Sequence, residues 1–275
     1  MRGRLSYLWS GLSFLVAGVV FLVPFGFILT TAGKDKVSAA DLAFSWPETA
    51  HFVDNFKAVL AARDFMLTRA FFNSTLLTLF SVGLLVVFGA MVGYVRQRRQ
   101  SRWNGLIDFM VLFGLIMPPA VVPTIWVMQS LYLFKTLTGL ILIEVAYGLS
   151  FSVLLFRAFV STIPKELDEA AIMDGASPLG LFFRVILPLL RPVAVTIVVV
   201  QSVAVFNDFT NPLYYLPGAE NATVQLTLYN FQSQFNTSFN LLFMNILIIT
   251  IPPLVMFLFF NRQIVEGITA GAVKG

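Results

Sequence analysis

Residues 161–192 read STIPKELDEAAIMDGASPLGLFFRVILPLLRP. In the second half of the chain, this is the longest polar segment between apolar runs that also carries several charges. Its pattern predicts two short helices joined by a turn. Pro164 suits a first helical position. The acidic residues after it would then lie in the opening turns, where the helix dipole favours negative charge; they are Glu166, Asp168 and Glu169.

Glycine and proline divide the rest of this stretch. Gly175 can end the first helix by taking a left-handed backbone conformation, since glycine has no Cβ. Ser177 followed by Pro178 can start the second helix, as its cap and first residue. Pro188 and Pro192 mark the next break, after which the chain becomes apolar again.

One face of the first predicted helix is made of mostly small side chains. Leu167, Ala170, Ala171 and Asp174 follow the i, i+3, i+4, i+7 spacing that brings residues to one side of a helix. Small side chains let another surface approach closely. The alternative is an ordinary helical loop between two membrane spans, with no partner.

The composition is that of a membrane protein. Of the 275 residues, 58% are hydrophobic and 12% are charged, about half the charged fraction usual in soluble domains. Cysteine is absent and His51 is the single histidine. Disulfides, thiol nucleophiles and histidine-cluster metal sites are therefore excluded. A net charge of +4 on such a chain gives no reason to expect nucleic acid binding.

Apolar runs long enough to cross about 30 Å of hydrocarbon predict six transmembrane helices. They cover residues 12–31, 76–95, 106–127, 139–160, 193–212 and 241–260. The first run exceeds the usual core of a signal peptide and lacks a clear cleavage site, so we expect an anchor. The expected fold class is all-α: a polytopic membrane protein with one permease domain over residues 1–275.

Basic residues predict the orientation of the spans. The short link 96–105 holds four arginines, whereas loop 213–240 has no Lys or Arg. Because basic residues gather on the cytoplasmic side, both termini and the stretch 161–192 are expected inside the cell. Five basic residues lie in the first outer loop, 33–70, but long loops follow this rule less strictly.

Several polar residues lie within or near the predicted spans. Glu144 falls inside the fourth span, where a carboxylate is a candidate functional group. The alternative is a structural residue near the outer headgroups. Polar residues also occupy the outer half of the fifth span; they are Gln201, Asn207, Asp208 and Asn211. Positions 201, 208 and 211 are spaced to line one helix face, and the alternative is that these residues cap a helix end. Gly89 and Gly93 are spaced for close helix packing.

The order Glu169-Ala170-Ala171, then Gly175, then Ile186-Leu187-Pro188 resembles the EAA loop of ABC importer permeases. In that family this cytoplasmic loop forms coupling helices that dock into a groove on the ATPase subunit. The resemblance implies a docking role for Glu166, Glu169, Ala170, Ala171, Asp174, Gly175, Leu187 and Pro188.

Two further stretches resemble the MalG-like permeases of carbohydrate importers. The tail 261–275 is similar to the end of these proteins, and residues 206–213 are similar to their fifth-helix signature, although Phe206 replaces a tryptophan. The resemblance implies a type I ABC importer permease fold in the bacterial plasma (inner) membrane. It also implies a second MalF-like permease subunit, an ABC ATPase dimer and an extracytoplasmic solute-binding protein as partners.

We therefore expect a permease subunit, not an enzyme, that moves a sugar or oligosaccharide across the lipid bilayer. No G-x-x-x-x-G-K-[ST] phosphate loop is present, so ATP and Mg²⁺ are expected on the partner ATPase and this chain needs no cofactor. Two alternatives remain, a permease for a non-sugar solute and an ion-coupled secondary transporter. The latter would need inverted repeats and midplane coupling residues, for which Glu144 is the one candidate.

Overall fold

The computed structural model describes residues 2–232 and 237–272, and this part of the chain contains helices and no strand. The last three residues of the predicted tail motif, 273–275, lie outside the described residues. The helices are α1 (Arg2–Ala32), α2 (Lys36–Ala40), α3 (Phe52–Arg98), α4 (Asn104–Ile116), α5 (Val121–Ser130), α6 (Leu137–Val160), α7 (Glu166–Met173), α8 (Pro178–Leu181), η1 (Phe182–Ile186), α9 (Leu187–Leu189), α10 (Arg191–Phe206), α11 (Thr210–Tyr215), η2 (Gln225–Phe231) and α12 (Phe239–Ala272).

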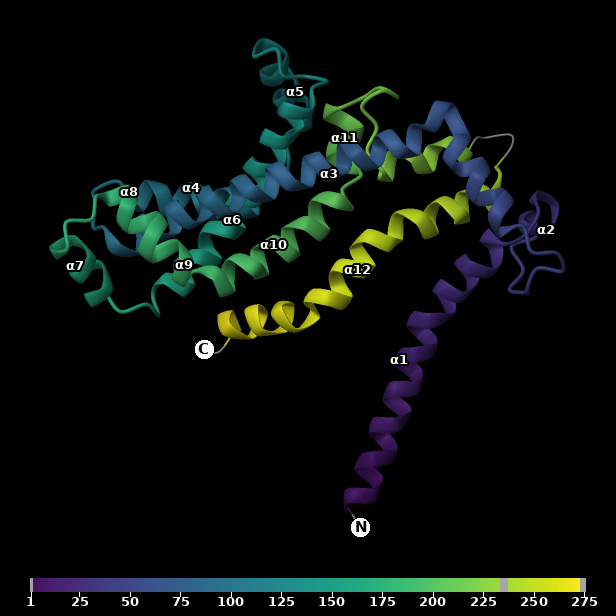
Figure 1. The fold of residues 1–275 in the computed structure, drawn as a ribbon, viewed down its shortest axis with the longest axis horizontal. Helices are drawn as coiled ribbons and strands as arrows, with labels where there is room; N and C mark the ends of the chain where they lie inside the picture. Colours follow the sequence, from purple (N-terminus) through teal and green to yellow (C-terminus); the bar gives the residue numbers. More distant parts are fainter. Residues whose placement is uncertain (1, 233–236, 273–275) are drawn as a thin grey trace. The chain divides into compact units, whose positions relative to one another are not determined.

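The chain divides into two compact units, and α3 and α12 each contribute residues to both. Unit 1 comprises residues 1–68 and 226–251, and unit 2 comprises residues 69–225 and 252–275. Within unit 2, α7 and α8 lie together at one end, while α5 and α11 lie toward the opposite end (Figure 1). Unit 2 therefore carries the stretch 161–192 and the polar residues of the fifth span at different ends.

Four described helices are long and apolar enough to cross a membrane, or up to six if each of two bent pairs forms one span. The upper figure equals the number of spans expected from the apolar runs. The predicted spans 12–31, 76–95, 139–160 and 241–260 fall within α1, α3, α6 and α12. The predicted span 106–127 falls in the first bent pair, whereas 193–212 begins in α10 of the second pair and extends past its end at Phe206 into α11.

The third predicted span, 106–127, is not one continuous helix. It is divided into α4 and α5, which are bent by 117° at residues 117–120. Pro118 and Pro119 supply no backbone N–H, and Met117 before them has the extended ψ of 127° that a following proline favours. The prolines therefore end α4 instead of only kinking it.

The second bent pair joins the stretch 161–192 to the fifth span. The helix that contains α8, η1 and α9 meets α10 at an angle of 76°. Pro188 lies inside this helix and cannot donate to the carbonyl four residues earlier. The backbone widens into a π-helical turn just before it, in which Leu187 N donates to Phe182 O. The break thus comes at Leu190, after Pro188 and before Pro192.

Close packing in unit 2 depends on the two glycines of the G-x-x-x-G pattern. A Cβ on Gly89 would come within 2.8 Å of Ser152 Cβ, and one on Gly93 within 2.9 Å of Arg157 N. Because these contacts are shorter than van der Waals separation, α3 and α6 approach more closely than any residue larger than glycine permits. The predicted role of the glycines in helix packing is confirmed.

Two apolar clusters form the core of unit 2. One joins α3, α6 and the helices after α7 through buried residues that include Ala90, Phe156 and Ile186. The other lies around Leu140 and Tyr215 and includes Leu77, Met128 and Val205. The first cluster supports the stretch 161–192, and the second supports the region around α11.

Unit 1 is held by a buried asparagine. The Asn55 Nδ2 group donates to Ala32 O and to Lys34 O, each at 2.8 Å, and Asn55 Oδ1 accepts from Asn240 Nδ2 at 2.9 Å. Asn55 and Asn240 are both buried. Since these bonds tie the end of α1 and the start of α12 to α3, one side chain joins three segments distant in sequence.

The short helix α2 in unit 1 starts at a capping carboxylate. Asp35 accepts hydrogen bonds from the Ser38 hydroxyl at 2.6 Å and from the Val37 and Ser38 backbone N–H groups. The Ser38 hydroxyl, helped by these N–H groups, lowers the pKa of Asp35 from 3.8 to about 2. The cap stabilises α2 at any pH above the unfolded value, and this contribution is lost as the pH falls through about 2.

Replacing Asn55 tests the network in unit 1. Asn55→Ala should leave the Ala32 and Lys34 carbonyls and the Asn240 amide without their partner, at a cost of about 1–3 kcal/mol for each buried group. We expect a lower apparent melting temperature of the purified protein and faster proteolysis between residues 33 and 51. Lys57→Ala, an exposed site on the same helix, is the control. Equal behaviour of the two variants would contradict the role given to Asn55.

Candidate functional site

The first candidate site is the stretch 161–192, called here the coupling loop. Its first helix, α7, begins at Glu166 with Lys165 as N-cap. The prediction that Pro164 occupies the first helical position is therefore wrong by two residues. The chain before α7 is held by another segment, because Arg98 of α3 donates from its Nη2 atom to Ile163 O at 2.9 Å and to Pro164 O at 3.4 Å.

The turn between α7 and α8 agrees with the prediction. Gly175 has φ +81°, its N–H donates to Ile172 O, and Ala176 N–H donates to Ala171 O, both at 3.0 Å. These two bonds form a Schellman motif, which ends a helix with a left-handed residue. Ser177 then caps α8 by accepting from Gly180 N at 3.1 Å, with Pro178 as the first helical residue.

The predicted docking residues fall into an exposed set and a packed set. Glu166, Glu169, Ala170, Asp174, Gly175 and Pro188 are exposed. Ala171 and Leu187 are half-buried and pack against the apolar cluster behind the loop. The exposed set presents carboxylates and backbone at the surface, while the packed set fixes the loop to unit 2.

Large apolar side chains also protrude from the coupling loop. Met173 has 86% of its surface exposed and Leu179 has 62%, with Ile172 and Phe183 exposed as well. Between α7 and α8 lies a hollow of about 660 Å³, lined by residues that include Asp174, Leu179 and Phe183. Exposed apolar groups in and beside such a hollow are typical of an interaction surface. No sequence pattern predicted these protruding side chains, because apolar residues are frequent throughout this chain.

An ion pair fixes α7 to the end of α3. Arg98 Nε lies 2.7 Å from Asp168 Oδ2, and the two side chains keep only 11% and 12% of their surfaces exposed. Asp168 was predicted only as a helix-dipole residue in α7. It is instead buried against Arg98 of α3. The face of α7 that packs against α3 is therefore the one opposite the exposed Glu166 and Glu169.

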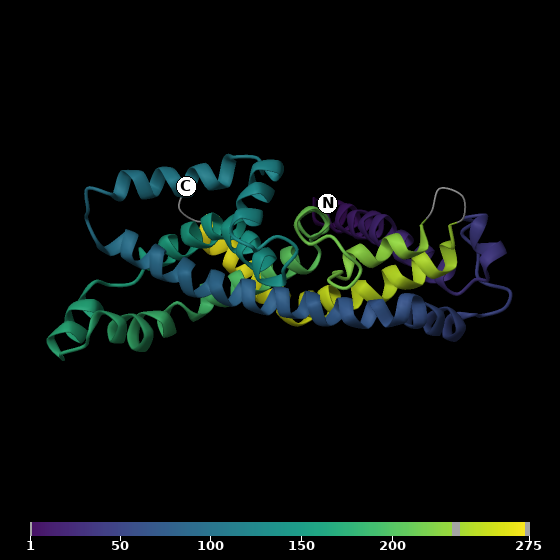
Figure 2. The ribbon, with the colours of Figure 1, turned by 90° about the horizontal axis from the view of Figure 1, so that it is seen from above.

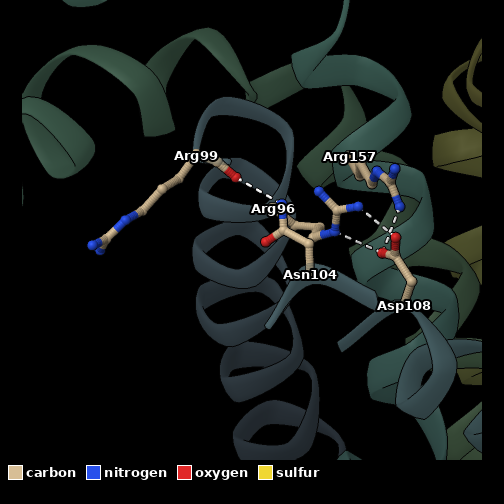
Figure 3. A network of polar contacts seen from close by, with 5 residues as sticks. All are labelled: Arg96, Arg99, Asn104, Asp108 and Arg157. Carbon is tan, nitrogen blue, oxygen red and sulfur yellow. Dashed lines mark hydrogen bonds and ion pairs between the residues drawn. The ribbon is translucent and has the colours of Figure 1, made fainter. Parts of the chain in front are cut away.

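A second set of charges joins α3, α4 and α6 at the same end of unit 2. Arg96 makes two hydrogen bonds to the Asp108 carboxylate, and Arg157 Nη1 donates to Asp108 Oδ1 at 2.8 Å (Figure 3). Asp108 belongs to α4 and Arg157 to the last turn of α6. One carboxylate therefore holds the ends of three helices together.

The second candidate site is the polar cluster, Glu144, Gln201, Asn207, Asp208 and Asn211. The prediction that its residues could line one face of a single helix is wrong, because α10 ends at Phe206. Asp208 caps the following helix, accepting from Thr210 N at 2.8 Å and Asn211 N at 3.3 Å. These bonds compete with continuation of α10, so the capping interpretation applies to Asp208.

The polar side chains are nevertheless brought together by the fold. The Glu144 side chain is buried, and its Oε1 atom accepts from Asn211 Nδ2 at 3.2 Å. Gln201 is buried and donates to Gly148 O at 3.3 Å, while the exposed Asn207 accepts from Gln225 Nε2 at 3.0 Å. Glu144 thus serves as an internal partner of Asn211, and Asn207 faces the surface.

No grouping of three or more His, Cys, Asp or Glu side chains that could hold a metal ion occurs in residues 2–232 and 237–272. The polar cluster contains amides and two carboxylates on different elements. Such groups can hydrogen-bond hydroxyl-rich molecules.

Comparison with known proteins identifies the family. Residues 85–269 match the model of the family described as binding-protein-dependent transport system inner membrane component. The chain is 31% identical over 269 residues to the melibiose/raffinose/stachyose import permease protein MelC of Bacillus subtilis, with 95% of each chain covered. It is 32% identical over 279 residues to the trehalose transport system permease protein SugB of Mycobacterium tuberculosis, with all of both chains covered.

The fold has a counterpart among solved structures. A bacterial ABC transporter involved in the import of the acidic polysaccharide alginate contains a chain that superposes with a TM-score of 0.81, at 20% identity and with 96% of this chain and 97% of that chain covered. The expected all-α permease fold is confirmed. The protein is a multi-pass membrane protein, and it belongs to the family of binding-protein-dependent transport system inner membrane components, which are permeases of ABC transporters and not enzymes.

Proposed function

We propose that the chain is the transmembrane permease subunit of an ATP-driven importer that moves a sugar or oligosaccharide across the bacterial plasma membrane. Support comes from relatives whose names specify carbohydrate import and which align over nearly the whole chain. The polar cluster adds amide groups, and the adjoining loop 213–240 has no Lys or Arg, a composition suited to neutral, hydroxyl-rich substrates.

The observation that carries the proposal is the exposed surface of the coupling loop. Met173 and Leu179 protrude next to exposed carboxylates, and α7, which carries Met173, is held to α3 by the Arg98–Asp168 pair. This surface receives the ATPase subunit, and the ATPase is the chain that binds ATP and Mg²⁺. The loop and both termini then lie in the cytoplasm, in agreement with the arginines of link 96–105.

The remaining partners follow from the type of transporter. A second, MalF-like permease subunit completes the membrane pathway, and an extracytoplasmic solute-binding protein delivers the carbohydrate. In a related structure, a bacterial alginate ABC transporter is in complex with a periplasmic protein that holds an alginate pentasaccharide; its matching chain has 15% identity and a TM-score of 0.68. The polar cluster of this chain lies toward the face where such a protein would deliver its ligand.

Asn207 and Asn211 form part of the translocation path, and Glu144 orients Asn211. Amides left against lipid would cost several kcal/mol, so they face protein or a water-filled passage. Gln201 lies deeper in unit 2, bonded to Gly148, and reaches the passage only when α10 moves away from α6.

Substitution of Gly175 tests the docking role of the coupling loop. Gly175 has φ +81° and open space around its Cβ position, so Gly175→Leu should act through backbone strain and not through a clash. If this strain raises the free energy of the docking conformation by about 1–2 kcal/mol, its population falls about five- to thirtyfold. We expect a corresponding loss of ATPase activity stimulated by sugar and binding protein in the reconstituted complex.

Two variants make this measurement specific. Gly175→Asn should retain most of the stimulation, because asparagine tolerates the left-handed conformation. Gly105→Leu has equally open space without a positive φ and should behave as the unchanged protein. If Gly175→Leu inserts into the membrane and shows full stimulated ATPase activity, the geometry of this turn does not matter for docking.

Cysteine accessibility tests the translocation path, and the absence of native cysteine removes background labelling. Asn207→Cys and Asn211→Cys should react with a small water-soluble maleimide in the resting complex. Gln201→Cys should react only in another state of the ATPase cycle, since Gln201 is buried here. Ser81→Cys, at a fully buried position, is the control that should stay protected. Protection at positions 201, 207 and 211 in every state would mean that these groups only stabilise the fold.

A further inference from the structure

The end of α3 and the start of α4 enclose a groove that neither candidate site uses. It has a volume of about 520 Å³ and is lined on its apolar side by residues that include Met91, Val92, Val95 and Ile107. Figure 2 shows the short link 99–103 that turns the chain from α3 into α4. Ser101 and Trp103 of this link also line the groove. The volume is within the range of small-ligand sites, which is about 300–1,000 Å³.

The link places polar groups at the mouth of the groove and holds them there. Asn104 donates from Nδ2 to Arg99 O at 3.0 Å and from its backbone N–H to Ser101 O at 3.0 Å. Trp103 follows Arg102, whose Cζ atom lies 5.3 Å from the centroid of the Trp103 ring. These bonds fix the backbone of Arg99 and the position of Trp103 relative to the apolar lining.

The arginines of this region differ in whether their charge is already neutralised. Arg96 is bonded to Asp108 and Arg98 to Asp168. Arg99 and Arg102 are exposed, and no carboxylate among the described residues forms an ion pair with either of them. Figure 3 shows the Arg99 side chain extending away from the Arg96–Asp108–Arg157 contacts. Arg99 lines the groove, and Arg102 lies against the ring of Trp103, which also lines it, so both charges are close to the groove.

The residues around the groove are of the kinds found at a membrane boundary. Val95 and Trp103 are about half exposed, and the outward face of α4 continues with the exposed Phe109 and Met110. Tryptophan and arginine are the side chains typical of the zone where hydrocarbon meets headgroups. An occupant of this groove must offer an anionic head to the arginines and an apolar tail to the residues beneath them.

We propose that this groove is a binding site for an anionic phospholipid. Its phosphate is held by Arg99 and Arg102 beside Trp103, and one acyl chain lies against Val95 and Ile107. A basic pocket between transmembrane helices is a known physical basis for recognition of anionic headgroups. Because Asn104 ties this link to α4, and Asp108 of α4 holds α3 and α6, the lipid would bind next to the charges that hold the three helix ends together.

Native mass spectrometry of the purified, delipidated importer complex tests this site, with phosphatidylglycerol and phosphatidylcholine of identical acyl chains as probes. Each arginine near an anionic headgroup should contribute about fivefold in affinity. Arg99→Gln combined with Arg102→Gln should therefore weaken phosphatidylglycerol binding about 25-fold and phosphatidylcholine binding far less, because the choline cation offsets the charge of its phosphate. The preference for phosphatidylglycerol should also decrease at high salt.

Two further variants distinguish a lipid in this groove from general charge attraction and from a partner subunit that covers the groove. Lys36→Gln combined with Lys57→Gln removes the same charge from unit 1 and should change neither affinity. Val95→Trp fills the groove without removing a charge and should weaken binding of phosphatidylglycerol. The proposal is overturned if the lysine control weakens binding as much as the arginine variant. It is also overturned if Val95→Trp blocks assembly of the complex while lipid binding is unchanged, because a partner subunit would then cover the groove.

Discussion

Two arginines in the last turn of α3 hold the coupling loop and the helix ends behind it in place. Arg98 pairs with Asp168 of α7, and Arg96 pairs with Asp108 of α4, which Arg157 of α6 also contacts. The Arg98–Asp168 pair is almost enclosed, so loss of one partner would leave a buried charge, at a cost of about 3–5 kcal/mol. The position of α7 thus depends on α3 as much as on its own sequence.

These contacts can transmit a movement of the coupling loop to the membrane helices, as the proposed function requires. A force applied to Met173 and Leu179 by the ATPase would reach α3 through Arg98, and α4 and α6 through the Asp108 contacts. Helices α3 and α6 approach closely at Gly89 and share an apolar cluster with the coupling loop. We therefore expect these three segments to move together. Movement of α10 relative to α6 would then expose Gln201.

Sequence patterns predicted the local features well and the distant contacts poorly. The turn at Gly175 and the cap at Ser177 follow from backbone conformations that few residues tolerate, so they could be identified without the fold. The end of α10 at Phe206 depends on the bonds that Asp208 makes to the next helix. The Arg98–Asp168 pair joins residues 70 positions apart in the numbering, which no local pattern reveals. Family resemblance supplied the proposed role of the loop, which its helical pattern alone left open.

The most direct test of the central claim is site-specific photo-cross-linking in the assembled importer. A photoreactive amino acid in place of Met173, the most protruding apolar residue of α7, should cross-link to the ATPase subunit. The same amino acid in place of Asn207 should give products with other components and none with the ATPase. If position 173 yields no ATPase product, or if the solute-binding protein is captured there instead, the coupling loop is not the docking surface and the proposed orientation is wrong.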